Sequence, residues 1–502
     1  MSFTSLQFIF GFLPAVYIIY VLASRFGGRQ WAISVLGMAS LVFYAMFGAQ
    51  LLLVLMISMV FNFTVGNVLA CLTAHPRVSR NLLLGGIIAN LTMLGYLKYT
   101  NFFVDVINQA AHTSFGHFDI AVPLGVSFFT FVQIGYLIDS YNGQLIKHDF
   151  ARYIVFTAFF PAVTAGPLVM QREMMEQLNG PGARAFDAKR VLIGLTMFAM
   201  GLFKKVVMAD AIAPFADQVF GGVHAGMGID AGTAWIGALC YALQLYFDFS
   251  GYSDMAIGLA TIFGIKLPLN FDSPFKSTNI SDFWRRWHMT MTRFFTAYAY
   301  SGLAMWGMRK SMALRTGKFG RFLLVAAVPS IITFIVAGVW HGSGWTYVIY
   351  GVMHGLAIAT YLGWREFSKI KLPTPVAWLV TMAMVVSGLV MFRAPDVPTA
   401  IAMLGHMWGF GQASASELIA IDTATAMSMI VIMGAVTLLL PNTQQILHHE
   451  WPVVDTKPED AELAAGLVAW RPSFSVSLIT ACIFTIGITS IGSSSGFLYY
   501  KF

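Results

Sequence analysis

Long apolar stretches recur along the whole chain, and they constrain its fold more than any other feature of the sequence. A helix needs roughly 17–25 mostly apolar residues to cross a bilayer. The clearest stretches cover residues 7–24, 31–47, 50–72, 81–97, 191–208, 322–340, 374–392, 425–440 and 474–491. With less regular segments added, the sequence predicts an all-α, polytopic integral membrane protein with about eleven to thirteen membrane segments.

Charged residues are too scarce for a water-soluble protein. They make up 11% of the 502 residues, whereas hydrophobic residues make up 57%. Soluble domains carry about 25% charged residues. No stretch is long and polar enough to form a separate soluble domain, so we expect one membrane domain over residues 1–502. The longest polar piece, residues 441–472, indicates a loop with an interfacial helix.

The basic residues predict how the protein is oriented in the membrane. Arg25 and Arg29 follow the first apolar stretch. Arg77 and Arg80 follow the third, whereas the connection at Gly48–Gln50 carries no charge. Connections rich in Arg and Lys stay in the cytoplasm, so we expect the N-terminus to face outward and the first stretch to be a retained span rather than a signal peptide. This bias accounts for the net charge of +7 without nucleic acid as a partner.

The segment Phe159–Pro167 interrupts the helical pattern. It contains two prolines and a glycine, which remove backbone donors and disturb helix geometry. Irregular backbone at membrane depth survives only where it is buried in protein or lines a watery cavity. We expect one of these settings here, with a simple helix kink as the alternative.

Residues 241–254 are dense in hydrogen-bonding groups although they lie in an apolar part of the chain. Tyr241, Gln244 and Asp248 recur at helical spacing on one face, and Asp254 lies on another. A helix that is polar on several faces cannot face lipid, so it belongs inside the bundle or beside a cavity.

Two interpretations of this segment remain open. In the first, it forms the wall of a cavity that receives a substrate. In the second, it is a structural network in which Lys204 or Lys205 pairs with the carboxylates, because an unpaired carboxylate is costly at membrane depth.

Arginines alternate with tryptophans in Asp282–His288, and the motif ends in a histidine. Trp284, Arg285 and Arg286 are residues of the kind that anchor a helix at the membrane interface. Arg285 also lies three residues before His288, on the same helical face. That face would suit an anionic cofactor, so a structural anchor and a binding site are both open interpretations.

The most informative motif is Gly338–Trp345. An apolar stretch delivers His341 between tryptophans and beside three glycines. Glycines let a substrate or a second helix approach the backbone closely. A histidine titrates near neutral pH and can take a proton from a hydroxyl group. The motif therefore predicts that His341 is a catalytic residue.

A further histidine, His354, follows His341 by thirteen residues. At about 100° per residue this spacing corresponds to about 220° around a continuous helix. The two side chains cannot face one site unless the helix breaks at Gly342–Gly344. We expect His354 to be structural or to support the site from behind.

Taken together and in chain order, these motifs resemble the membrane-bound O-acyltransferase (MBOAT) family, and within it the bacterial alginate O-acetyltransferase branch. The resemblance rests on residues 122–131, 159–167, 201–207, 241–255, 270–275, 283–288, 340–342, 392–394 and 497–502. It implies a ring of tilted helices around a thin centre with a central tunnel. Within this ring we expect peripheral N-terminal helices in residues 1–120, a catalytic core in 121–360 and C-terminal helices in 361–502.

The resemblance also implies roles for individual residues. His341 matches the catalytic histidine of the family, and His288 matches its second functional histidine. We expect His341 to act as general base on an acceptor hydroxyl, with a covalent acetyl-histidine as the other route. His288 would orient the donor or stabilise oxyanion charge. Further candidates for contacting the donor or the substrate, of which the basic ones would attract phosphates, are Arg285, Arg286, Trp284, Trp340, Asp248, Gln244, Tyr241, Lys204 and Lys205.

The implied reaction moves an acetyl group from a cytoplasmic thioester donor, acetyl-coenzyme A (acetyl-CoA), toward an extracytoplasmic polysaccharide. Members of this branch work with separate secreted or membrane-anchored periplasmic acetyltransferases, so we expect such a partner. The expected location is the bacterial inner membrane. We expect no permanently bound cofactor and no metal, because no ligand cluster with metal spacing appears in the sequence.

The chain departs from the pattern of alginate O-acetyltransferases after Trp287-His288. It has Thr292–Gly302 and Met308–Lys310 where many members have Arg-Asp-Tyr and Gly-Gly-Asn-Arg stretches. The acceptor is therefore open between alginate, cellulose and another exopolysaccharide. Transfer of D-alanine to teichoic acid is an alternative, as is a non-enzymatic transporter with Asp248 and Asp254 on an ion path.

Overall fold

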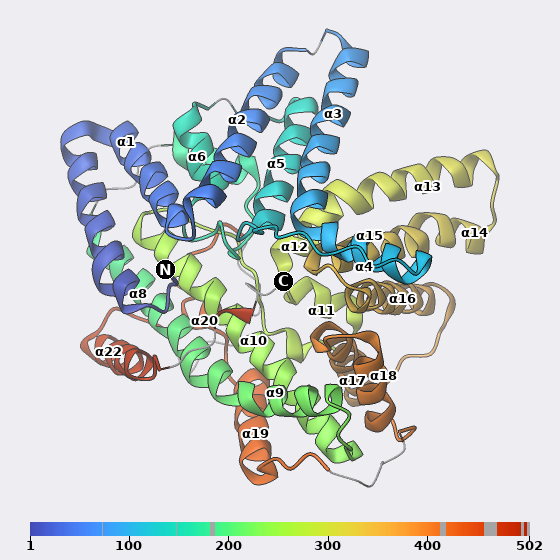
Figure 1. The fold of residues 1–502 in the computed structure, drawn as a ribbon. Coiled ribbons are helices and arrows are strands. Elements are labelled where there is room, and N and C mark those ends of the chain that lie inside the picture. The colour runs from blue at the N-terminus through green and yellow to red at the C-terminus, as the bar shows by residue number, and fades with distance from the viewer. Residues whose placement is uncertain are drawn as a thin grey trace.

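The computed structural model describes residues 1–72, 74–146, 148–180, 186–411, 418–455, 469–492 and 496–498. In this part of the chain the only regular elements are helices, joined by loops with isolated β-bridges. The all-α class is therefore confirmed. Figure 1 shows the helices arranged around α10 (Ala231–Ile262), which crosses the middle of the molecule.

The first part of the chain supplies the helices before residue 120. They are η1 (Gln7–Phe12), α1 (Leu13–Ala45), α2 (Ala49–Cys71), α3 (Pro76–Leu94), η2 (Gly95–Tyr99) and α4 (Thr100–Ala111), of which η1 and η2 are π-helical turns. The run through α1 kinks at Gly28, whose φ of 74° and ψ of −170° favour glycine. The predicted segments 7–24 and 31–47 therefore lie on two arms of one kinked run.

The middle of the chain supplies the central helices and the helices that hold the histidines. They are α5 (Val126–Tyr141), α6 (Phe150–Ala158), α7 (Gln171–Asn179), α8 (Ala188–Phe203), η3 (Lys204–Ala209), α9 (Asp210–His224), α10, η4 (Pro274–Lys276), α11 (Ile280–Arg286), α12 (Met289–Phe295), η5 (Thr296–Tyr300), α13 (Ser301–Ala313), α14 (Lys318–Phe322), η6 (Leu323–Ala327), α15 (Val328–His341) and α16 (Trp345–Phe367). The hairpin of α13 and α14 projects from the body of the molecule (Figure 1).

The last helices return to α10. They are α17 (Thr374–Arg393), α18 (Val397–Met407), α19 (Thr423–Leu439), α20 (Thr443–Ile446) and α22 (Phe474–Thr489). The short helix α20 lies in the polar piece 441–472, and its residues Thr443–Gln445 are buried. The interfacial helix predicted for this piece concerns in part residues 456–468, which lie outside the described residues.

Within the described residues, six helical runs are long and apolar enough to cross a membrane: Gln7–Ala45, Ala49–Cys71, Pro76–Ala111, Ala188–His224, Lys318–His341 and Thr374–Arg393. Three shorter apolar helices are α18, α19 and α22. All nine apolar stretches of the sequence fall on helices. The polytopic fold is confirmed, although six long runs are fewer than the about eleven to thirteen predicted segments. One reason is that kinked or joined helices count as one run.

Helix α10 is buried on all sides and carries the buried carboxylates. Asp248 forms an ion pair with Lys205 at 2.7 Å, and Lys205 also forms an ion pair with Asp210 at 2.7 Å. Asp254 pairs with Lys204 at 2.6 Å. These contacts match the structural-network interpretation, because each carboxylate gains the partner that a low-dielectric interior requires.

The segment after α6 is irregular, as the prolines predict. Residues 159–170 form turns and extended backbone, and most of them are buried. Side chains from other elements bond to its backbone: the Phe160 amide donates to Ser40 Oγ at 3.0 Å, and the Leu168 amide donates to Thr290 Oγ1 at 3.1 Å. The irregular backbone of residues 159–170 is therefore buried in protein, and the segment is not a simple helix kink.

Helices α15 and α16 approach closely through glycines. A Cβ atom on Gly338 would overlap the carbonyl oxygen of Tyr347, and one on Gly351 would overlap the carbonyl oxygen of Phe334. Gly338 of the His341 motif thus serves the approach of a second helix.

Gly338→Ala is expected to reduce the free energy of unfolding by about 1–3 kcal/mol, because the added methyl group overpacks the contact between α15 and α16. Thermal unfolding of purified protein in detergent measures the change. Gly434→Ala in α19 is the matched control, since a Cβ there has nothing within 4 Å. Equal effects of the two substitutions would contradict the close-approach explanation.

Lys205→Met is expected to reduce the free energy of unfolding by about 3–5 kcal/mol, because it leaves Asp248 buried without its cation. Lys189→Met removes a partly exposed pair with Glu450 at 2.9 Å and should change stability by only about 0–1 kcal/mol. The same unfolding measurement compares the two variants. A Lys205→Met protein as stable as the Lys189→Met protein would show that the buried pair is dispensable.

Candidate active site

His341 ends helix α15 and is 5% exposed. The chain then turns through Gly342–Gly344, and α16 begins at Trp345. The helix therefore breaks at Gly342–Gly344. The spacing between His341 and His354 requires such a break if the two side chains are to approach one site. Around the His341 ring lie the rings of Trp340 and Phe392, with centroids 4.7 and 5.1 Å away.

His288 lies between helices α11 and α12 and is fully buried. Its φ of 45° and ψ of 51° are left-handed, a conformation that costs a non-glycine residue on the order of 1–3 kcal/mol and clusters at functional sites. The turn directs the chain so that Trp287 forms an antiparallel bridge with Phe271. The bridge brings the Asn270 region alongside the histidine.

Asn270 holds His288 in one orientation. Its amide nitrogen donates to Ser253 Oγ at 3.0 Å, which assigns the other amide atom, Oδ1, as an acceptor. His288 Nδ1 lies 3.0 Å from that oxygen, so Nδ1 carries the proton. Thr290 Oγ1 donates to the same oxygen at 3.0 Å. Neutral His288 therefore has Nε2 as its acceptor nitrogen.

The two histidines come together although they are far apart in the chain. Their ring centroids are 6.4 Å apart, and the ring of Trp340 lies 5.9 Å from His288. The Trp340 indole N–H is buried and donates to no described residue. His341, His288 and Trp340 thus form a buried cluster of two imidazole rings and an indole hydrogen-bond donor.

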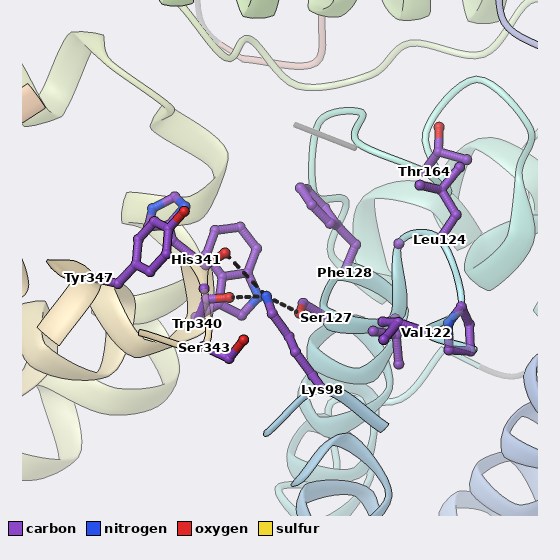
Figure 2. Close-up of a pocket in the computed structure, with 14 residues that line it drawn as sticks. Lys98, Val122, Leu124, Ser127, Phe128, Thr164, Trp340, His341, Ser343 and Tyr347 are labelled. Atoms are coloured by element: carbon purple, nitrogen blue, oxygen red, sulfur yellow. Dashed lines mark hydrogen bonds between the residues drawn. The ribbon is translucent and has the colours of Figure 1, made fainter. Parts of the chain in front are cut away.

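A cavity of about 380 Å³ borders this cluster. Figure 2 shows its lining, which combines the backbone and side chains of the Trp340–Ser343 turn with residues from the first third of the chain. Hydroxyl groups in the lining come from Ser127, Thr164, Ser343 and Tyr347, and an ammonium group comes from Lys98. A lining of this polarity suits a hydroxyl-bearing substrate.

A second cavity, of about 290 Å³, lies beside α11 and is lined by Trp284 and Arg285. Arg285 is largely exposed and pairs with Asp282 at 2.6 Å. Arg286 pairs with Asp282 at 3.1 Å and with Asp272 at 3.6 Å. Of the two arginines predicted to meet an anionic donor, Arg285 is the one placed at a cavity.

His354 lies one layer behind His341. The Tyr350 ring stands between them, 6.2 Å from His341 and 4.5 Å from His354. Trp284 Nε1 donates to His354 Nδ1 at 3.2 Å. A supporting role for His354 stays a prediction, and its position agrees with that role.

The predicted donor contacts of Lys204 and Lys205 in η3 and of Asp248 in α10 need correction. Lys205 is 1% exposed between two carboxylates, so it cannot reach a donor phosphate. Asp248 is its buried partner and accepts from the Leu498 amide at 3.1 Å. Lys204 Nζ is engaged by Asp254 and by Thr443 Oγ1 at 2.8 Å. The cost of leaving these charges unpaired explains why the lysines serve the fold.

Tyr241 and Gln244 are likewise buried in the helix packing around α10. The ring centroids of Tyr241 and Phe220 are 6.0 Å apart, and the Arg393 guanidinium lies 5.8 Å from the Tyr241 centroid. These contacts are those of a packed interior. A substrate-binding role for Tyr241 and Gln244 stays a prediction.

Sequence reasoning missed Asn270 and Lys98. Asn270 belongs to a stretch that matches the family, but no pattern indicated that its amide would hold His288. Lys98 directly follows the apolar stretch 81–97, and an ionisable residue in a membrane segment is a functional signal by itself. In the described residues no group of three or more His, Cys, Asp or Glu is placed to hold a metal ion.

Comparison with known proteins identifies the family. A family model described as MBOAT, membrane-bound O-acyltransferase family, matches residues 127–397. A peptidoglycan O-acetyltransferase of Helicobacter pylori is 35% identical over 450 residues, covering 83% of this chain and 81% of the relative. A probable alginate O-acetylase AlgI of Pseudomonas aeruginosa is 37% identical over 426 residues, covering 83% and 77%. A teichoic acid D-alanyltransferase of Bacillus subtilis is 28% identical over 269 residues, covering 53% and 65%.

The family model spans more than half of the chain, and it includes both His288 and His341. The chain therefore belongs to the membrane-bound O-acyltransferase family and is a multi-pass membrane O-acyltransferase.

Proposed function

We propose that the protein takes an acetyl group from acetyl-CoA at the cytoplasmic side and passes it to a hydroxyl for O-acetylation of a polysaccharide. The observation that carries this proposal is the buried pair of His341 and His288 beside a polar cavity of about 380 Å³. The two relatives of higher identity have names that state acetyl transfer to peptidoglycan or alginate. The candidate acceptors are therefore alginate, cellulose and another exopolysaccharide, as the sequence predicts, with peptidoglycan added from the relative's name.

His341 is the general base in this proposal. It takes the proton of the acceptor hydroxyl while the hydroxyl oxygen attacks the thioester carbonyl. The new carbon–oxygen bond forms, the carbon–sulfur bond breaks, and the coenzyme A thiolate leaves with the proton that His341 held. If the histidine attacks first, an acetyl-histidine forms and the acceptor then removes the acetyl group.

His288 and Trp340 assist the step in different ways. The Asn270 contact leaves neutral His288 with an acceptor nitrogen, which fits orientation of a hydroxyl or of an amide N–H of the donor. The Trp340 indole N–H donates to no described residue, so it is suited to the oxyanion that develops on the carbonyl. Oxyanion stabilisation by His288 itself would require a second proton on its ring.

The orientation of α15 and α16 supports acceptor entry from outside the cell. The run Lys318–His341 begins after a basic stretch, and α16 ends in another at Arg365–Lys371. Basic connections stay in the cytoplasm, so the turn at Gly342–Gly344 lies toward the outer face. The cavity beside that turn would meet the acceptor. The second cavity, with Arg285 at its edge, would meet the donor phosphates.

In this proposal the protein would lie in the bacterial inner membrane with its N-terminus outward. A secreted or membrane-anchored periplasmic acetyltransferase would then receive the acetyl group and complete the transfer to the polysaccharide. The family resemblance supports both the acetyl-CoA donor and the partner protein, and an assay with labelled acetyl-CoA tests the donor.

The alternative of D-alanyl transfer draws on the teichoic acid D-alanyltransferase, which matches about half of the chain. The transporter alternative required Asp248 and Asp254 on an ion path. Both carboxylates are instead held in ion pairs with Lys205 and Lys204. Acetyl transfer is therefore the function that the site supports best.

His341→Ala is expected to lower the rate of thioester consumption about 10²- to 10⁴-fold, because the general base is lost. The measurement uses purified protein in nanodiscs with acetyl-CoA labelled in the acetyl group. His75→Ala is the matched control, since His75 is exposed at the start of α3. Acetyl transfer that persists in the His341→Ala protein would reject the assignment.

The same assay separates the donors and the routes. Consumption of acetyl-CoA but not of a D-alanyl thioester on a carrier protein would support acetyl transfer, and the reverse preference would support the teichoic acid alternative. Label that stays on the wild-type chain after quenching, and not on the His341→Ala chain, would establish the acetyl-histidine route. Transport into vesicles without thioester consumption would instead favour the transporter.

A further inference from the structure

The C-terminal end of α15 is bonded by two neighbouring residues from a distant part of the chain. The last four carbonyl groups of an α-helix have no partner within the helix. Tyr99 OH donates to the Val339 carbonyl at 2.7 Å. Lys98 Nζ donates to the Trp340 carbonyl at 2.7 Å and to the His341 carbonyl at 3.2 Å. Three of the four terminal carbonyls of the helix that carries His341 are thus satisfied.

All three protons of the Lys98 ammonium are used by the protein. The third goes to Ser127 Oγ, in the first turn of α5, at 3.2 Å. Figure 2 shows these three bonds converging on the Lys98 nitrogen, among the residues that line the cavity. An ammonium group with three acceptors has no proton left for a substrate anion. Its position therefore indicates a role in holding the site rather than in binding the donor.

The location of Lys98 is costly without such a role. It lies in the membrane-spanning run Pro76–Ala111, within the π-helical turn η2. In the described part of the chain, no carboxylate pairs with it. The negative end of the α15 dipole and the carbonyl oxygens supply the compensating charge. The cation and the helix end thus stabilise each other across two distant segments.

We propose that Lys98 and Tyr99 act as a carbonyl clamp, defined by these two side chains, that positions His341 for the reaction. The residue after His341, Gly342, has extended backbone and does not continue the helix. Without the clamp the last turn of α15 would fray, and the imidazole would move with its backbone. The inference rests on the proposed catalytic role of His341.

The clamp makes the N-terminal helices part of the catalytic apparatus. Residues 98 and 99 lie outside the stretch 127–397 that the family model matches. They also lie in the segment 1–120 that the sequence predicts to be peripheral. A purely structural role would predict a general loss of stability, whereas a positioning role predicts a local change at the α15 end and a loss of turnover.

The test compares Lys98→Met, Lys98→Arg, Tyr99→Phe and Thr100→Ala in nanodiscs. The Lys98→Met chain is expected to lose kcat at least about tenfold with an unchanged KM for acetyl-CoA, because only the geometry of the base changes. Lys98→Arg should recover part of this loss, since the guanidinium also donates to carbonyls. Thr100→Ala is the control, because its hydroxyl donates only within its own helical run, to the Tyr96 carbonyl at 2.7 Å.

Hydrogen–deuterium exchange supplies a readout that does not depend on activity. Exchange of the backbone amides in residues 338–346 should rise in Lys98→Met, and exchange in α19 should stay as in the wild type. A kcat equal to the wild type together with unchanged exchange would overturn the clamp.

The outcomes separate the clamp from the proposed function. If His341→Ala retains activity, the catalytic assignment fails, and the exchange experiment alone decides the clamp. If His341→Ala is inactive while Lys98→Met turns over normally, the clamp fails and the assignment stands. If Lys98→Met does not fold, Tyr99→Phe decides, because it removes one hydroxyl: unchanged exchange and kcat would then overturn the proposal.

Discussion

Charged side chains and backbone groups at membrane depth need partners within the protein, and much of this structure depends on that requirement. The hydrocarbon core holds no water, so an unpaired backbone group there costs on the order of 2–7 kcal/mol, and an unpaired charge costs more. On α10 the requirement pairs Asp248 with Lys205 and Asp254 with Lys204. In the irregular segment 159–170 it recruits the hydroxyls of Ser40 and Thr290. At the end of α15 it recruits Lys98 and Tyr99.

The same requirement acts at the candidate active site. His288 adopts a left-handed backbone conformation that a side chain disfavours, and the contact of its ring with Asn270 offsets that cost. Asn270 is in turn held by Ser253 and Thr290. These hydrogen bonds hold the His288 ring in place before substrate arrives, which is what the proposed chemistry needs.

Close helix packing brings these networks to one point. Gly338 and Gly351 let α15 and α16 approach until their backbones nearly touch, and the turn between the helices ends beside the polar cavity. Lys98 in η2, the loop before α5 and the first turn of α5, all from the first third of the chain, supply the other side of that cavity. The chemistry proposed for His341 therefore draws on segments that span most of the sequence.

Local patterns of the sequence predicted the helices, the interruption at Phe159–Pro167 and His341 as a candidate catalytic residue. They could do so because the spacing of apolar residues, the prolines and the glycines act on the backbone within a few residues. They also narrowed the partners of the α10 carboxylates to two lysines. Only the tertiary structure decided which lysine pairs with which carboxylate, that His288 lies near His341, and that Asn270 and Lys98 hold them. Lys98 and Trp340 are 242 residues apart. Contacts over such separations follow from how whole helices pack, and no local period encodes them.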